Sequence, residues 1–526
     1  MVYSKLKTDE LSFNMIKTEA LLYLVNSMTK PEKKAFMIAS DNKKVSNYLK
    51  LYNLIIKESE ISAESLRAKY ESLYKGASFD TSVNYLYKVL LDTMLELRKE
   101  QDSYYSLFDK IMKARILFEK SLYKECFDLL HKVMNSAKEM ENYYALLISS
   151  RFELEYLLSL NFPDTDEKSL LHKHFKLNET LRFTQKIHQQ AALYELLRHR
   201  MIYKGNARSE TQKTALNDLV VSEMSIVASS NLENLEINKL HQLFQANYLI
   251  SVGDYKSALH SFYELNTLLE GNKHLWSDPP IYYVLTLEGV LDSLRSLRQY
   301  EGMTHFIEKL KKLNTPSLNF NTNVTCLIFL YEVFPFLDKG DFAACDQLLN
   351  AYTEKLLKKT QLLSLARNAE LALYIALIQL GLKEPRKAQK TLSKIIATSK
   401  GFANLPLYRT IRLVNLMIMY ELREFELIKL ETRTFKRDMQ ATGKEFKTER
   451  KILSFVNKPS LPISAVKRKL MWEKLKKDFD LIQHDVYEQQ TLRLFDFTAW
   501  MESKIRKVSL AEVLMHRAES IGHRAN

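Results

Sequence analysis

The chain has 526 residues, which is long for one globular core and predicts several cores or one elongated stack of helices. Only 11 Gly and 10 Pro occur and 46% of the residues are hydrophobic, which excludes a turn-rich β fold and a largely disordered chain. The formal net charge of +14 favours association with anionic partners.

Cysteine usage and the apolar runs bear on the cellular compartment. Cys126, Cys326 and Cys345 are too few and too scattered for a disulfide framework or a cysteine-based metal site. Residues 1–15 lack the apolar core of a secretory signal. The longest apolar run, about 326–337, is shorter than the roughly 20 residues that a membrane-spanning helix needs. We therefore expect a soluble, cytoplasmic protein that does not insert into a membrane.

The first part of the chain predicts an N-terminal tail at 1–16 and a separate helical module at 17–100. Thr29 and Glu32 have the spacing of a capping box at the start of a helix. This spacing predicts that the module begins with short, well-capped helices.

Two more helices are expected within this module. Ser62 is expected to cap the first of them, and Gly76 to end it. Asp80 is expected to cap a long helix that reaches about residue 99. The module would then lead directly into the next region of the chain.

The clearest local signal is the turn at Gly253 and Asp254. Gly253 can adopt the left-handed conformation that ends a helix, and Asp254 can accept the first free amide protons of the next helix. Tyr255, Ala258 and Phe262 then lie on one face of that second helix. Because the small side chain of Ala258 lets two helices approach closely, the stretch predicts a helical hairpin.

The same turn recurs at intervals of about 43 residues. The position two residues after each break is aromatic or proline: Tyr123, Tyr255, Tyr300, Phe342, Pro385 and Phe425. The long interval between the first two of these positions predicts two further turns, near residues 167 and 211. Helix breakers occur at both places, at 162–166 and 205–209. About eight hairpins are therefore implied between residues 101 and 440.

These turns resemble those of tetratricopeptide-type (TPR-like) repeats. The likeness lies in three stretches: Gly253-Asp254-Tyr255, Gly340-Asp341-Phe342 and Gly381 with Ala388. The family repeat has about 34 residues, so longer helices and a less regular superhelix are expected here. The chain is also similar to a group of uncharacterised bacterial helical-repeat proteins. The resemblance implies an all-α fold, an α-solenoid with helical N- and C-terminal caps, and a concave surface that binds a protein or peptide.

Residues 441–526 predict a non-repeating, basic helical cap. A basic helix is expected at 466–482, and an apolar face on the helix that follows it: Leu494, Phe497, Trp500, Met501 and Ile505. A terminal cap is needed because the last repeat would otherwise expose its apolar side.

Nearly all the excess positive charge lies in the last quarter of the chain. Residues 381–526 contain 30 Lys and Arg against 17 Asp and Glu, whereas the whole chain contains 77 and 63. Part of this charge falls at helical positions i, i+4, i+7 and i+8: Lys429, Arg433, Lys436 and Arg437. Three further residues repeat the spacing and would extend the stripe if the helix reaches them: Lys444, Lys447 and Lys451. Arg409 and Arg412, and then Lys467, Arg468 and Lys469, add to the same region.

Three interpretations of this stripe remain open. It could be a solvated helix face balanced by acidic residues at pairing distance: Glu424, Glu426, Glu431, Glu445 and Glu449. It could meet an acidic protein surface. It could hold the phosphate backbone of nucleic acid, including ribosomal RNA, although aromatic residues for base stacking are sparse among the cations.

Motifs for catalysis are not found. The chain has no phosphate-binding glycine loop and no His-Glu-x-x-His run, and Cys126 and Cys345 are most simply packing residues. We expect no catalytic residue, cofactor, metal or small-molecule substrate. The leading hypothesis is a non-enzymatic scaffold or adaptor for a protein or peptide, and the alternative is binding of RNA or a ribonucleoprotein such as the ribosome.

Overall fold

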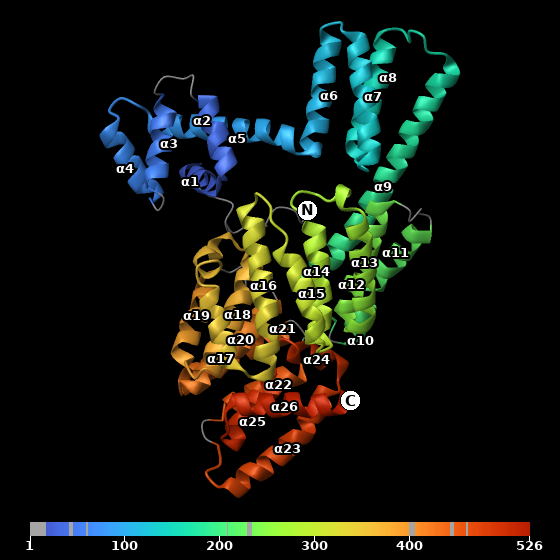
Figure 1. The fold of residues 1–526 in the computed structure, drawn as a ribbon. Helices are drawn as coiled ribbons and strands as arrows, with labels where there is room; N and C mark the ends of the chain where they lie inside the picture. The colour runs from blue at the N-terminus through green and yellow to red at the C-terminus, as the bar shows by residue number, and fades with distance from the viewer. Residues whose placement is uncertain are drawn as a thin grey trace. The chain divides into compact units, whose positions relative to one another are not determined.

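The computed structural model describes residues 17–40, 46–58, 61–207, 209–228, 234–398, 406–441, 446–458 and 461–525. These residues form 26 α-helices and two 3-10 helices, and no strand occurs among them (Figure 1). The expected all-α fold is confirmed. The chain divides into two compact units, unit 1 (Met1–Gln185) and unit 2 (Lys186–Asn526), with the border inside α9 (Glu167–Lys204).

Unit 1 contains two groups of helices before α9. The first group shares one core: α1 (Lys17–Ser27), α2 (Lys30–Ser40), α3 (Asn47–Lys57), α4 (Ala63–Leu73) and α5 (Phe79–Gln101). Phe36 and Tyr70 are wholly buried in this core. The second group packs in chain order: α6 (Ser103–Glu119), α7 (Tyr123–Glu139) and α8 (Tyr143–Ser159). The predicted tail at 1–16 lies outside the described residues.

The helix starts of unit 1 test the predicted caps. The capping box is confirmed, because Thr29 N donates to Glu32 Oε2 at 2.7 Å and Glu32 N donates to Thr29 Oγ1 at 3.4 Å. The predicted cap at Asp80 is wrong. The helix begins two residues earlier, so Ser78 accepts the hydrogen bond from Thr81 N at 3.4 Å. Asp80 lies in the first turn, where a carboxylate complements the helix dipole.

Unit 2 begins with the second half of α9 and continues through seventeen α-helices. They are α10 (Glu210–Thr214), α11 (Asn217–Ala228), α12 (Leu235–Val252), α13 (Tyr255–Gly271), α14 (Ile281–Ser296), α15 (Tyr300–Lys311), α16 (Leu318–Lys339), α17 (Phe342–Ala351), α18 (Leu365–Gly381), α19 (Pro385–Thr398), α20 (Pro406–Glu421), α21 (Phe425–Ala441), α22 (Lys447–Val456), α23 (Ala465–Gln483), α24 (Val486–Leu492), α25 (Phe497–Arg506) and α26 (Leu510–Ala525). The 3-10 helices are η1 (Lys273–Leu275) and η2 (Leu357–Leu362). Neighbouring helices pack in pairs from α12 to α21, and one core runs from these pairs into α22–α26.

The predicted turns coincide with helix starts. α7, α13, α15, α17, α19 and α21 each begin at the residue inferred from the recurring interval, and α9 and α10 begin near the two inferred turns, at Glu167 and Glu210. However, α9 runs without a break for 38 residues, because it contains neither Gly nor Pro. Two of the inferred hairpins therefore share one continuous helix. The number of about eight hairpins stays a prediction.

One residue conformation is common to six of these turns. The residue two positions before the helix start has a positive φ at each of them: Ser121, Gly253, Arg298, Gly340, Lys383 and Arg423. The next amide then donates to a carbonyl five positions back, as in Asp254 N to Leu249 O at 2.9 Å. This is the Schellman pattern, which satisfies the last carbonyls of the preceding helix. Side-chain caps from Asp254 and Asp341 complete two of the turns.

Gly381, which belongs to one of the three family-like stretches, lies inside its helix. α18 includes it, and Lys383 takes the left-handed conformation at that turn. A Cβ atom on Gly381 would lie 2.1 Å from the ring of Phe342. Gly289 of α14 faces the ring of Phe262 in the same way, at 2.2 Å. Both glycines therefore permit the close approach of a helix to an aromatic ring.

α16 is the one described helix with the length and composition of a membrane span. It extends the apolar run noted in the sequence by several residues toward its N-terminus. Of its most apolar window, 67% is buried inside the protein. Its apolar side chains, such as Phe329 and Val333, pack in the core of unit 2.

Gly340→Ala should destabilise unit 2 by about 1–3 kcal/mol. Its φ is +81°, and a Cβ atom there would lie 2.9 Å from the carbonyl oxygen of Ala511. Urea unfolding followed by tryptophan fluorescence tests this, because Trp276, Trp472 and Trp500 all lie in unit 2.

Gly302→Ala is the matched control. It lies inside α15, and its Cβ atom would meet only the side chain of Leu294, at 3.4 Å. Its unfolding free energy should stay unchanged or rise by up to about 1 kcal/mol. Equal effects of the two substitutions would contradict the role assigned to Gly340.

Candidate binding site

The cations at helical spacing on α21 form an exposed row. We call Lys429, Arg433, Lys436 and Arg437 the basic row. Lys429 Nζ lies 2.7 Å from Glu426 Oε1, one turn away on the same helix. No described carboxylate forms an ion pair with the other three. Their charge is therefore open to solvent or to a partner.

The predicted extension of this row on a single helix is wrong. α21 ends at Ala441 and α22 begins at Lys447, so the later cations belong to another helix. Lys447 Nζ pairs with Asp485 Oδ2 at 2.8 Å, and Lys451 pairs with Asp478. Both lysines therefore hold α22 against other parts of the C-terminal region. Lys444 lies outside the described residues.

Two arginines of the same region also have structural roles. Arg412, which is nearly buried, pairs with Glu431 and Asp438 at 2.6 Å each. Arg409 pairs with the buried Glu449 at 3.0 Å. Glu449 is therefore a core residue of α22, where the sequence suggested the surface of a solvated helix.

The remaining candidates lie at the start of α23. Arg468 donates to the carbonyl oxygens of Pro462 and Ile463, at 3.1 and 2.6 Å, and so holds the chain that precedes the helix. Lys467 and Lys469 are exposed, and no described carboxylate forms an ion pair with them. The structure thus separates the cations of the last quarter into those that bond to other groups of the chain and those that are free on the surface.

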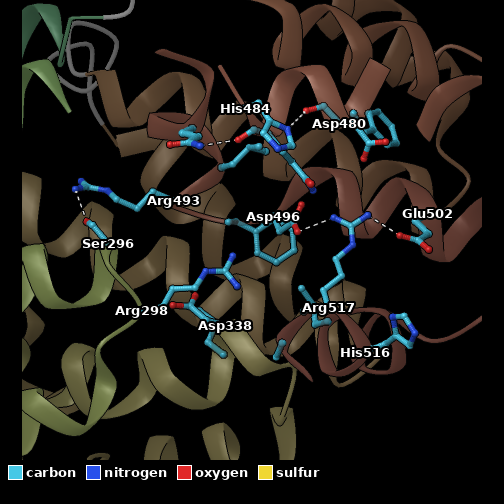
Figure 2. Close-up of a pocket in the computed structure, with 18 of the residues that line it drawn as sticks. Ser296, Arg298, Asp338, Asp480, His484, Arg493, Asp496, Glu502, His516 and Arg517 are labelled. Atoms are coloured by element: carbon cyan, nitrogen blue, oxygen red, sulfur yellow. Dashed lines mark hydrogen bonds and ion pairs between the residues drawn. The ribbon is translucent and has the colours of Figure 1, made fainter. Parts of the chain in front are cut away.

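A cleft of about 680 Å³ lies in unit 2, where the ends of α14 and α16 and the start of α15 meet α23–α26. We call it the arginine cleft (Figure 2). Its charged lining consists of Arg295, Arg298, Asp338, Lys476, Asp480, Arg493, Asp496, Glu502, Arg506 and Arg517. Apolar side chains complete the lining, including Trp472 and Phe479.

Arg295 is the most deeply buried arginine of the cleft lining. Its Nη2 and Nε atoms lie 3.0 and 3.2 Å from the two carboxylate oxygens of Asp338. Nη1 donates to Tyr374 Oη at 3.0 Å, and the guanidinium lies 3.4 Å from the ring centroid of Phe334. Burial and the neighbouring Asp338 raise the pKa of Tyr300, whose hydroxyl donates to the same carboxylate at 3.0 Å. These contacts join α14, α15, α16 and α18.

Arg493 links the C-terminal region to α14. Its Nη1 atom pairs with Asp292 Oδ2 at 3.1 Å and donates to Ser296 Oγ at 3.0 Å. Its guanidinium also lies over the ring of Tyr255, at 4.9 Å from the centroid. The segment between α24 and α25 is thereby fixed on the hairpin helices.

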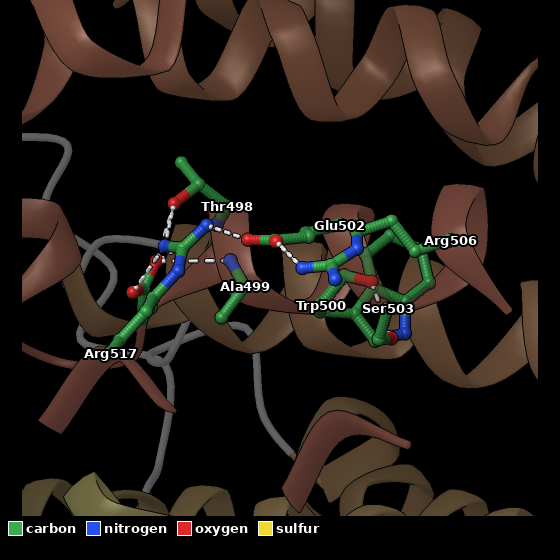
Figure 3. A network of polar contacts seen from close by, with 8 residues as sticks. Thr498, Ala499, Trp500, Glu502, Ser503, Arg506 and Arg517 are labelled. Atoms are coloured by element: carbon green, nitrogen blue, oxygen red, sulfur yellow. Dashed lines mark hydrogen bonds and ion pairs between the residues drawn. The ribbon is translucent and has the colours of Figure 1, made fainter. Parts of the chain in front are cut away.

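Arg517 of α26 organises the part of the lining that comes from α25 (Figure 3). Its Nη1 atom lies 2.7 Å from Asp496 Oδ2 and 2.7 Å from Thr498 Oγ1, and Nη2 pairs with Glu502. Glu502 also accepts from Arg506 at 2.7 Å. Burial raises the pKa of Asp496, but Arg517 and the hydrogen bonds of Thr498 and Ala499 outweigh it and leave that pKa below its ordinary value.

The rim of the cleft differs from its walls. Arg298 and Lys476 are exposed there, and no described carboxylate pairs with either of them. His484 and His516 also face the cleft, and the Nδ1 atom of His484 lies 2.7 Å from the carbonyl oxygen of Asp480 (Figure 2). The paired walls neutralise one another, so the rim cations are suited to an anionic group such as a carboxylate or phosphate.

Sequence reasoning missed the arginine cleft. Its residues come from segments about 200 positions apart, as in the pair between Arg493 and Asp292. One local signal was present. Glu288, Asp292 and Arg295 recur at i, i+4 and i+7 within the otherwise apolar helix α14. Charges on the apolar face of a helix indicate partners inside the fold.

The three cysteines are fully buried, as the packing interpretation requires. Burial raises the pKa of the Cys126 thiol to about 11 and those of Cys326 and Cys345 to about 12. Each thiol therefore stays protonated near neutral pH, which disfavours nucleophilic chemistry at these positions.

Comparison of the chain with protein-family models, with curated proteins and with solved structures gave no match. The functional interpretation therefore depends on the geometry of the described residues.

Asp338→Asn should lower the free energy of unfolding of unit 2 by about 2–4 kcal/mol, because it leaves the guanidinium of Arg295 buried without a counter-charge. The double substitution Arg295→Met with Asp338→Leu should be less destabilising, since no charge is left unpaired. Urea unfolding by tryptophan fluorescence measures both. A single variant as stable as the natural protein would show that the pair does not hold the helices together.

The acid stability of unit 2 should depend on Asp496. Its folded pKa lies below the unfolded value of about 3.9, so the carboxylate contributes stability above about pH 4 that is lost as pH falls through the folded pKa. The Asp496→Asn variant should therefore have a lower free energy of unfolding than the natural protein at pH 7. The difference between the two free energies should become smaller below pH 4. Unfolding curves of both proteins between pH 3 and pH 7 measure it, and a constant difference would contradict the assignment.

Proposed function

We propose that the protein is a non-enzymatic scaffold or adaptor that works in the cytoplasm. In this proposal the TPR-like hairpins, about eight in number, form an α-solenoid whose surface binds a protein or peptide. The basic C-terminal quarter then attracts and holds an acidic partner. The recurring turns, the pairing of neighbouring helices and the distribution of cations support the proposal.

The observation that carries the proposal is the difference between two classes of cation. Arg409, Arg412, Lys447 and Lys451 are paired with carboxylates of the same unit. The basic row beyond Lys429 is exposed and makes no such pair. Cations that only solubilise a helix face are commonly balanced by neighbouring acids, and the acids near this row are already engaged. Glu431 and Asp438, for example, pair with Arg412.

The arginine cleft offers a second point of attachment in the same unit. Its volume of about 680 Å³ lies in the usual range of ligand pockets, and its rim cations suit a carboxylate. A partner that carries an acidic segment could engage the cleft with one side chain or with its terminal carboxylate. Binding an acidic segment in this way requires no catalytic residue in the cleft.

The alternative function is binding of RNA or a ribonucleoprotein such as the ribosome. The three unpaired cations of the basic row, Arg433, Lys436 and Arg437, favour it as well, because each phosphate that a cation neutralises releases counterions. Such binding would weaken steeply with salt and would tolerate changes of RNA sequence. Aromatic side chains beside the row are few, so base stacking would add little.

Replacing Lys429, Arg433, Lys436 and Arg437 with Glu should weaken retention of the partner from native lysate by about tenfold or more, because attraction becomes repulsion. The measurement is the amount of each co-purified protein and of RNA, by mass spectrometry and absorbance. Loss of proteins without loss of RNA supports the adaptor, and loss of RNA supports the alternative.

A control with the same change in charge is available in unit 1. Lys120, Lys124, Lys132 and Lys138 are exposed, and replacing them with Glu should leave retention unchanged. If neither variant changes what is retained, the basic row is a solvated helix face and the proposal is wrong.

A further inference from the structure

All the exposed residues of α8 lie along one face of the helix. They are Tyr144, Ile148, Arg151, Glu155, Leu158 and Ser159. Three of them are large and apolar, since Tyr144, Ile148 and Leu158 are 58%, 37% and 60% exposed. We call the first five residues the α8 face, because they recur at i, i+4, i+7, i+11 and i+14. Neither Arg151 nor Glu155 forms an ion pair with another described residue.

The other side of α8 is packed within unit 1. The ring of Tyr156 stacks on that of Phe118 of α6, with the centroids 3.9 Å apart. Glu153 Oε1 lies 2.7 Å from His131 Nε2 of α7 and 2.6 Å from Lys173 Nζ of α9. These three helices therefore occupy one side of α8. The α8 face is the side that the described residues of unit 1 leave uncovered.

The last four residues of the α8 face have the same order of apolar and charged side chains in both directions. Arg151 and Glu155 lie two residues to either side of position 153, and Ile148 and Leu158 lie five residues to either side of it. If two copies of α8 lie antiparallel with these midpoints together, Arg151 of each copy faces Glu155 of the other. Ile148 of each copy likewise faces Leu158 of the other. The α8 face is thus complementary to itself about a two-fold axis.

Other occupants fit the α8 face less well. Two copies in parallel would set Arg151 against Arg151 and Glu155 against Glu155. A membrane surface is disfavoured because the charges lie in the middle of the apolar face, whereas interfacial helices carry them on the opposite face. Nucleic acid is disfavoured because one cation and one carboxylate give the face no net charge. Among these occupants, the antiparallel second copy alone pairs both charges and both apolar ends.

We propose that the protein self-associates through the α8 face, with two copies of α8 packed antiparallel about a two-fold axis. Apolar contacts at both ends bury exposed area, and the two central ion pairs fix the direction and register of the helices. A single helix face is smaller than the roughly 800 Å² per partner of a standard interface, so we expect a reversible dimer that forms at micromolar concentrations.

This inference goes beyond the proposed function and does not depend on it. Each dimer carries two basic rows, so a partner with two acidic segments could be held by both copies at once. Such double attachment raises the overall affinity without any new contact at either site.

Two single cysteine variants of the full-length chain test the geometry of the dimer. Ile148→Cys mixed with Leu158→Cys should give a dimer with a short thiol crosslinker, because the two positions face each other. Either variant alone should give about tenfold less product, since its two cysteines would lie about 15 Å apart along the helices, beyond the reach of the reagent. The three natural cysteines are buried and should contribute little background. Equal product in all three samples, or none in any, would overturn the proposal.

Exchanging the two charges tests the ion pairs. Arg151→Glu should weaken self-association by about tenfold or more, because two carboxylates then face each other in both pairs. Adding Glu155→Arg to the same chain makes the facing charges opposite again and should restore association to within about threefold of the natural protein. Sedimentation velocity at concentrations up to about 100 μM measures each dissociation constant.

Arg182→Glu is the matched control, because Arg182 is an exposed cation of α9 in the same unit and lies outside the α8 face. It should leave the dissociation constant unchanged. A natural protein that stays monomeric over the whole range would overturn the proposal. So would a double variant that associates no better than Arg151→Glu alone, or an equal loss with the control.

Discussion

The turn between paired helices is the constraint on which the rest of the structure depends. A residue in the left-handed conformation stands two positions before the second helix, and the next amide closes the end of the first helix. This arrangement reverses the chain within a few residues, so consecutive helices must pack against each other. Four of the six turns use a residue other than glycine there, at a cost of order 1 kcal/mol each. Packing of the paired helices offsets that cost.

Buried charges provide a second layer of organisation in unit 2. Arg295, Arg493 and Arg517 each pair with carboxylates from other segments, and together they connect the hairpin helices with α24–α26. Such pairs add little net stability compared with apolar residues of the same size, but a misplaced helix would leave one charge unpaired. They therefore specify how the C-terminal helices dock, and they form the arginine cleft as a consequence.

Much of the fold could be predicted from the sequence because its signals are local. The aromatic residues after each break, such as Tyr255 and Phe342, lie within a few positions of the residues that form the turn. The continuous course of α9 was missed because the inferred interval placed turns at both of its ends and implied a separate helix pair between them.

The candidate sites were less predictable because their partners are distant in the chain. The common face of the basic row on α21 followed from its helical spacing. The pairing of Arg412, Lys447 and Lys451 did not, because spacing shows which face a cation occupies and leaves open what packs on it.

We propose that the free cations of unit 2 hold an acidic protein. The most direct test is to isolate the protein with its partners from native lysate, treat the complex with nuclease and analyse what remains bound. We predict that a protein partner survives nuclease treatment and is released by salt. Complete release of all partners by nuclease alone would contradict the claim and would identify the protein as a binder of nucleic acid.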